Sequence, residues 1–128
     1  MLVLGLIAAA LAAALHIVIF YMESIAWEGA LARKTFGGTP DEARPHAFYA
    51  FNQGFYNLFL AVETIVGIVL IAAGSRGIGA ALVLAGTGSM LAAALVLLLA
   101  SRAHRAAALK QGALPLIAVL ATTAGLLL

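Results

Sequence analysis

Polar side chains occur inside two long apolar stretches of the chain, where each of them needs a physical reason. The first stretch holds three that fall on one face of a helix turning 100° per residue: His16, Glu23 and Trp27. A carboxyl group and an imidazole can bind and release protons, and a carboxylate can hold a cation. The spacing therefore predicts a titratable stripe along one helix.

The second stretch carries a set of amides, a phenol and a further carboxyl group: Asn52, Gln53, Tyr56, Asn57 and Glu63. At 1.5 Å per residue, counted from Trp27 and Ala47, Glu23 lies roughly 6 Å inside its helix and the first two amides lie roughly 8–9 Å inside theirs. His16 reaches roughly the same depth as the phenol and the third amide. If the helices are antiparallel neighbours, Glu23 meets Asn52 and Gln53.

The same count places His16 at the depth of Tyr56 and Asn57, so we expect these residues to meet. Glu63 lies roughly 24 Å deep and is separate from the cluster. Interhelical hydrogen bonds in membranes average only about 0.6 kcal/mol, so a network of this size stabilises the fold poorly. We therefore predict a binding pocket formed by His16, Glu23, Trp27, Asn52, Gln53, Tyr56 and Asn57, with Glu63 as a secondary residue. The alternative is a structural polar clasp between the two helices.

The elements that position these residues must be membrane spans. Of the 128 residues, 65% are hydrophobic and 9% are charged, whereas a soluble domain is about half apolar and about a quarter charged. About 20 apolar residues cross a bilayer, and four stretches qualify: 2–27, 47–73, 78–100 and 112–128. The last can begin near Ala106 if Lys110 snorkels. The first lacks a basic start and is too long for a signal peptide, so we expect it to be retained.

The distribution of lysine and arginine predicts the orientation. The loops 28–46 and 101–111 carry six of the seven basic residues, and only Arg76 lies on the opposite side. We therefore expect these two loops to be cytoplasmic. The predicted fold is one all-α domain, residues 1–128, a four-transmembrane-helix bundle with both termini outside (N-out/C-out).

The first loop contains its own structural signals. We expect the helix to continue through 28–35 and to stop at Phe36-Gly37-Gly38. Thr39-Pro40-Asp41-Glu42 predicts a second helix start, with Thr39 as N-cap and Glu42 closing a capping box. This loop is a connector or, alternatively, a lid over a pocket.

Small residues dominate the last two spans. Ala85, Ser89 and Ala93 form a small-residue ridge, which predicts helix packing and could also supply a homodimer contact through the third span. Pro115 is expected in the first turn of its helix.

Several functions are excluded by composition. No cysteine is present, so disulfides and thiolate metal sites are absent. We predict no metal site and no cofactor, because three scattered histidines do not form one. The net charge of +2 is too small for a nucleic-acid surface. His46 and His104 are expected to be solvated, and Trp27 and Tyr49 to anchor the chain at the membrane interface.

The pattern His16-Ile-x-Ile-Phe-x-Met-Glu23-x-x-x-Trp27, with Phe36-Gly37 and Asn52-Gln53-Gly54-x-Tyr56-Asn57, resembles a bacterial family of small four-span membrane proteins. That family is catalogued as a domain of unknown function. The resemblance implies a four-span fold in the bacterial cytoplasmic (inner) membrane and marks the same residues, but it implies no activity.

Three functions fit these observations. The first is binding or transport of a small molecule or ion at Glu23, in which case a transporter of this size would need to be a dimer. The second is an accessory membrane subunit or a lipid-binding protein. The third is a membrane-embedded acid/base enzyme acting on a lipophilic substrate, with His16, Tyr56 and Asn57 assisting Glu23; whether the chain is an enzyme stays open.

Overall fold

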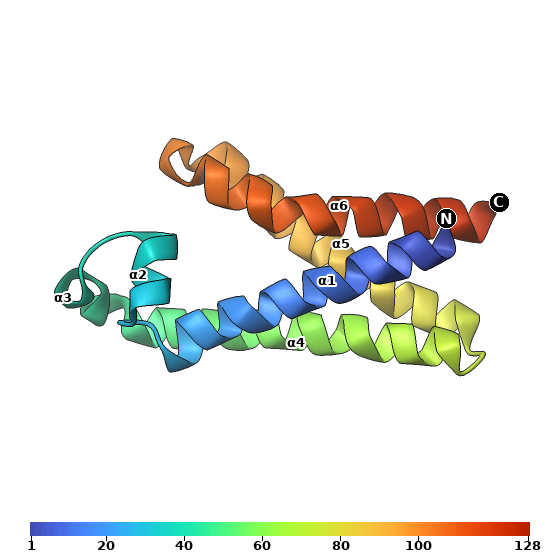
Figure 1. Ribbon diagram of the computed structural model, residues 1–128, viewed down its shortest axis with the longest axis horizontal. Helices are drawn as coiled ribbons and strands as arrows, with labels where there is room; N and C mark the ends of the chain where they lie inside the picture. Colours follow the sequence, from blue (N-terminus) through green and yellow to red (C-terminus); the bar gives the residue numbers. More distant parts are fainter. The chain divides into compact units, whose positions relative to one another are not determined.

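The computed structural model describes residues 1–128, which form helices and no strands (Figure 1). The elements in chain order are α1 (Leu2–Phe20), η1 (Tyr21–Ile25), α2 (Ala30–Phe36), α3 (Pro40–Ala43), η2 (Arg44–His46), α4 (Ala47–Ala72), α5 (Arg76–Ala100), η3 (Arg102–His104) and α6 (Arg105–Leu127). Four continuous helical segments are long and apolar enough to cross a membrane: Leu2–Ile25, Pro40–Ala72, Arg76–Ala100 and Arg102–Leu127. The predicted all-α bundle of four transmembrane helices is confirmed.

The boundaries of these helices correct the expected spans in two places. The first span ends at Ile25, and a turn separates it from α2, so the helix is interrupted; α2 nevertheless covers most of 28–35 and ends at Phe36, before Gly37, as predicted. The second segment begins at Pro40 because it includes α3 and η2, whereas α4 itself begins at Ala47, the expected start. The fourth helix, α6, already begins at Arg105, as the snorkelling alternative allowed, and it occupies most of the expected loop 101–111.

The early start of α6 places Pro115 inside the helix rather than in its first turn. Proline lacks an N–H and removes one helical hydrogen bond. In a membrane helix this is tolerated, because neighbouring groups satisfy the carbonyl that loses its partner. Pro115 is fully buried, so its ring also contributes to packing.

Two compact units make up the chain. One, here called the four-helix unit, consists of Met1–Ala14 and Leu60–Leu128. The other, here called the 15–59 unit, consists of Leu15–Phe59. Helices α1 and α4 each contribute residues to both units.

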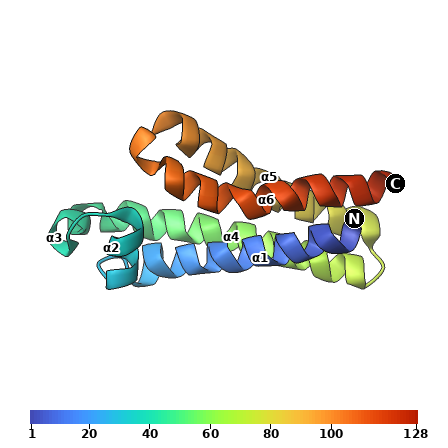
Figure 2. The same ribbon diagram turned by 45° about the horizontal axis from the view of Figure 1, so that its top comes forward.

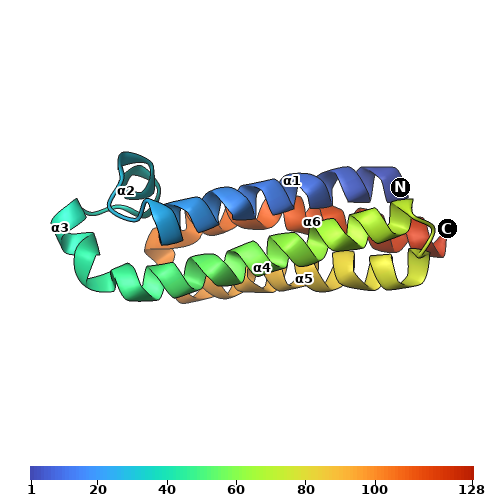
Figure 3. The same cartoon turned by 90° about the horizontal axis from the view of Figure 1, so that it is seen from below.

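The four-helix unit packs through small residues, which is the expected mode for membrane helices. Gly67 and Gly79 bring α4 and α5 so close that a Cβ on either would lie within 2.7 Å of the other's carbonyl oxygen. Its core contains short side chains around one valine: Ala8, Ala9, Val83 and Ala118. Figures 2 and 3 show α5 and α6 running antiparallel, side by side, in this unit.

The expected packing ridge on α5 lies on a different face of the helix. Ala85, Ser89 and Ala93 are exposed, whereas the buried face consists of Gly79, Ala80, Val83, Gly86, Thr87, Met90 and Ala94. In a helix that is apolar all round, small side chains occur on several faces. The choice between them depends on neighbours that periodicity does not specify.

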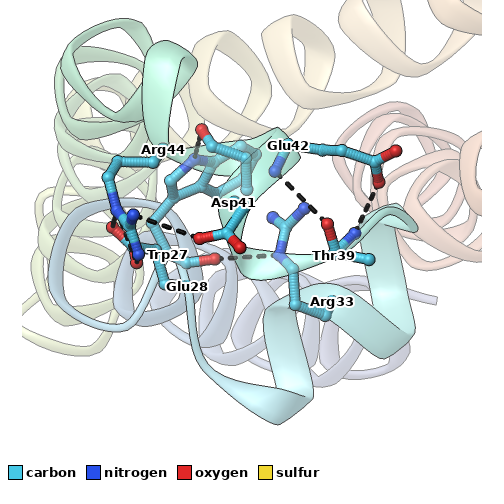
Figure 4. Close-up of polar contacts among 8 residues, drawn as sticks. Trp27, Glu28, Arg33, Thr39, Asp41, Glu42 and Arg44 are labelled. Carbon is cyan, nitrogen blue, oxygen red and sulfur yellow. Dashed lines mark hydrogen bonds and ion pairs between the residues drawn. The ribbon is translucent and has the colours of Figure 1, made fainter.

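The 15–59 unit joins the end of α1 to the start of α4 through two short helices. Gly37 ends α2 with a φ of 84°, a backbone conformation that glycine adopts without strain. Thr39 then caps α3: its hydroxyl accepts a hydrogen bond from the Glu42 N–H, and the Glu42 side chain accepts one from the Thr39 N–H. The predicted capping box is confirmed, and Figure 4 shows both bonds.

Candidate functional site

Glu23 lies in an unusual stretch of backbone. Residues Tyr21–Ile25 form a π-helical turn, which the Ala26 N–H closes by donating to the Tyr21 carbonyl oxygen at 2.9 Å. At Ala26 the backbone leaves the helix, with φ −126° and ψ 42°. π-helical turns are rare in proteins. Where a single one occurs within a helix, it often lies at a functional site.

One oxygen of the Glu23 carboxyl group is held by an amide from α4. Asn57 Nδ2 donates to Glu23 Oε2 at 2.8 Å and to the Gln53 carbonyl oxygen at 3.2 Å. Asn57 is buried, with 7% of its surface exposed. Both hydrogens of this amide are therefore used, and the amide fixes the carboxyl group from one side.

Gly54 sets the distance between the two helices at this level. A Cβ at position 54 would clash with Ser24 Oγ and would lie 3.1 Å from Glu23 Cβ. The Ser24 hydroxyl donates to the Phe51 carbonyl oxygen at 2.7 Å. The missing side chain thus allows α4 to pack directly against η1.

An open pocket of about 310 Å³ lies beside this contact. Its lining consists of Glu23, Trp27, His46, Tyr49, Ala50 and Gln53. The last four occupy positions i, i+3, i+4 and i+7 along η2 and α4, so they share one helical face. A carboxyl group, an imidazole, an amide and two aromatic rings therefore surround one small volume.

The Trp27 ring is fixed from three directions. Its Nε1–H donates to the Ala43 carbonyl oxygen at 2.8 Å. The Arg33 guanidinium lies over the ring, 4.3 Å from its centroid, and Phe36 packs against it at 5.5 Å. Arg33 Nε also donates to the Trp27 carbonyl oxygen at 3.1 Å, so α2 holds both the backbone and the ring (Figure 4).

Ion pairs outside the pocket link η2 to α3 and to the turn between η1 and α2. Arg44 contacts Glu28 at 2.9 Å and Asp41 at 3.1 Å (Figure 4). The hydrogen bond from Arg44 lowers the pKa of the Glu28 carboxyl group below its ordinary value. Both pairs are exposed, so each contributes little to stability by itself.

The structure brings together part of the residue set that the sequence predicted. Glu23, Trp27 and Gln53 line the pocket, and Asn57 holds the glutamate. Asn52 and Tyr56 are exposed and make none of these contacts; 61% of the Tyr56 surface is exposed.

The two remaining candidates lie elsewhere. His16 is completely buried and is not among the pocket residues. Glu63 lies in the four-helix unit and is half-buried. No group of three or more His, Cys, Asp or Glu side chains is arranged to hold a metal ion.

The pairing of the polar residues differs from the depth count by about one helical turn. Glu23 meets Asn57 rather than Asn52, because the close contact at Gly54 sets the register. The count assumed that the helix runs to Trp27. The helix ends at Ile25, and residues 26–29 form a turn, so Trp27 reaches Ala43 instead of the level of Ala47.

Two pocket residues were assigned to other roles by the sequence. His46 was expected to be solvated and Tyr49 to anchor at the interface, yet both line the pocket, although both are also exposed at the surface of the chain. Their spacing with Gln53, three and four residues apart, was the available signal. It was not used because the second span was expected to begin at 47, which left His46 in the loop 28–46.

A family model described as a protein of unknown function, DUF1304, matches residues 10–123. The matched segment covers the whole 15–59 unit and most of the four-helix unit. No match was found among curated proteins or among solved structures.

Proposed function

We propose that this chain, which belongs to the DUF1304 family of proteins of unknown function, binds a small organic cation at the pocket beside Glu23. Integral membrane character and the four-helix fold are the premises of this proposal. The observation that carries it is the position of a half-buried carboxyl group that lines a pocket and has no basic partner.

Glu23 has no oppositely charged partner within the chain. Its only hydrogen-bond donor is the neutral amide of Asn57, and neither salt bridge of the chain includes it. Carboxyl groups in membrane spans usually pair with another group or mark a pathway for ions or substrates. A bound cation would neutralise the carboxylate without any change in the surrounding helices.

The other pocket residues favour an organic cation over a metal ion. Tyr49 offers aromatic surface, which attracts ammonium groups, and the Trp27 ring already binds one cation, the Arg33 guanidinium. Gln53 and His46 offer acceptors for a hydroxyl or amine elsewhere on the ligand. The volume of about 310 Å³ is at the lower end for ligand pockets, so the ligand is expected to be small.

The charge distribution supports a cytoplasmic opening for this pocket. Between α1 and α4 lie three basic residues, Arg33, Lys34 and Arg44, and loops rich in lysine and arginine stay in the cytoplasm. We therefore include N-out/C-out orientation, in a bacterial cytoplasmic membrane, in the proposal.

Fluorescence of Trp27 tests the proposal, because Trp27 is the only tryptophan and lines the pocket. The purified protein in mild detergent is titrated with choline and with its neutral analogue 3,3-dimethyl-1-butanol. We expect a saturable change with choline alone. Glu23→Gln should weaken choline binding about 10- to 100-fold, since a hydrogen bond or contact to a charged group contributes about 1.5–3 kcal/mol.

The matched control is Glu63→Gln, the same chemical change in the four-helix unit. It should leave the titration unchanged. Equal responses to choline and to the neutral alcohol, or equal losses in the two variants, would contradict a cation site at Glu23.

A further inference from the structure

A second cavity lies in the four-helix unit, between α5 and α6, and its walls are almost entirely apolar. Its volume is about 220 Å³. The lining includes three leucines from α5 and three residues from α6: Leu91, Leu95, Leu98, Leu109, Ala113 and Leu116. On each helix these positions form one stripe, so the cavity is a groove along the line where the helices meet.

Small residues form the floor of this groove and leucines form its rims. Gly112 lies so close to α5 that a Cβ there would be 3.0 Å from the Cβ of Ala94. Three of the rim leucines are exposed, Leu95 at 48%, Leu109 at 61% and Leu116 at 45%, and the other two are half-buried. Narrow separation at the floor and long side chains at the rims give a channel suited to a thin apolar chain.

Positive charge is concentrated near the groove. Arg102 and Arg105 lie between Leu98 and Ala108, the lining residues nearest the α5–α6 connection. Lys110 lies within the lining stretch of α6; all three are exposed, and no aspartate or glutamate follows Glu63 in the sequence. Arg105 is fixed to the groove wall, because its Nε donates to the carbonyl oxygen of Leu98 at 3.3 Å. The two terminal nitrogens of its guanidinium make no hydrogen bond within the chain and can hold a phosphate in a bidentate manner.

We propose that this groove binds an anionic phospholipid, with one acyl chain between α5 and α6 and the phosphate on Arg105. Charge complementarity favours this occupant, since basic sites between membrane helices bind anionic headgroups.

Native mass spectrometry of the full chain in mild detergent tests this proposal. The probes are dioleoyl phosphatidylglycerol and dioleoyl phosphatidylcholine, which have the same acyl chains and differ in net charge. We expect one tightly bound phosphatidylglycerol and weaker binding of phosphatidylcholine. Arg105→Gln should weaken phosphatidylglycerol binding about fivefold, the effect of one near-surface basic residue on an anionic lipid.

A larger side chain in the groove should weaken the binding of both lipids. Ala113→Phe and, as a second variant, Leu95→Trp place a larger side chain in the groove at exposed positions. Each variant should bind phosphatidylglycerol and phosphatidylcholine more weakly than the wild type does. The matched controls are Arg76→Gln at the opposite end of α5 and Ala10→Phe at an exposed position of α1 outside the groove. Both controls should bind lipid as the wild type does.

Three results would overturn the proposal. One is equal binding of the two lipids by the wild type. Another is unchanged binding in both groove-filled variants, with helical content by circular dichroism also unchanged. The third is competition by inorganic phosphate at an affinity equal to that of the lipid, which would show that the groove adds nothing to the headgroup contact.

Discussion

Replacing Gly54 with alanine should separate the two helices that carry the candidate site. The added Cβ would clash with Ser24 Oγ and would lie 3.1 Å from Glu23 Cβ. Relief requires Ser24 Oγ to move, which breaks its bond to the Phe51 carbonyl, and η1 to shift by a few tenths of an ångström, which weakens the bond from Asn57 to Glu23.

The magnitude follows from two contributions. Overpacking of a well-packed site costs about 1–3 kcal/mol. Two interhelical hydrogen bonds in a membrane add about 0.6 kcal/mol each. We therefore expect Gly54→Ala to lower the free energy of unfolding by about 2–4 kcal/mol.

Unfolding in mixed micelles of mild detergent and dodecyl sulfate, followed by Trp27 fluorescence, measures this change. The matched control is Gly88→Ala in α5, where an added Cβ meets nothing within 4 Å. This control should be neutral or should stabilise by up to about 1 kcal/mol through helix propensity. Combining Gly54→Ala with Ser24→Ala removes the closest contact and should restore part of the loss. Equal stability of Gly54→Ala and Gly88→Ala would refute the close contact as the feature that sets the register.

Three further predictions concern the groups around the pocket. Asn57→Ala removes the only donor to the carboxyl group of η1 and should destabilise by about 1–3 kcal/mol in the same unfolding assay; an unchanged midpoint would contradict this bond. The pKa of Glu28 is lowered by Arg44, so the stabilisation is complete above the ordinary pKa of 4.5 and disappears as the pH falls through the lowered value. Stability measured against pH should therefore fall in acid less steeply for Glu28→Gln, and identical profiles would argue against the pair. Arg33→Gln removes the guanidinium from the Trp27 ring and should shift the emission spectrum, with a loss of about 0.5–1 kcal/mol; an unchanged spectrum would show that the stacking does not persist in solution.

The sequence was sufficient for the four spans and for the capping box. Membrane insertion depends on summed apolarity over about 20 residues, which can be read without knowing any neighbour. The box at Thr39 and Glu42 is equally local, since both partners lie within four residues.

The details of the site could not be predicted in the same way. The π turn at Glu23 adds one residue to a helical turn, and neither hydropathy nor the 100° stripe responds to it. The register between α1 and α4 depends on the contact of Gly54 with Ser24, two residues 30 positions apart. The partner of Glu23, Asn57, therefore lies about one helical turn away from the predicted partners.

The buried face of α5 was unpredictable for a related reason. Its sequence contains several small residues on every side, so Gly86 and Thr87 are chosen over Ala85 and Ser89 by the helices that pack there. The exposed ridge of Ala85, Ser89 and Ala93 stays a prediction for a homodimer contact, which crosslinking of single-cysteine variants in the membrane would test.

The most direct test of the cation site uses no added ligand. The protein is extracted from its host membrane in mild detergent and examined by native mass spectrometry as wild type, Glu23→Gln and Glu63→Gln. We predict a bound small mass of a cationic molecule in the wild type and in Glu63→Gln, and its loss in Glu23→Gln. A bare protein in all three samples, or a mass retained in Glu23→Gln, would contradict the account; the bare protein would favour an accessory role with a partner subunit.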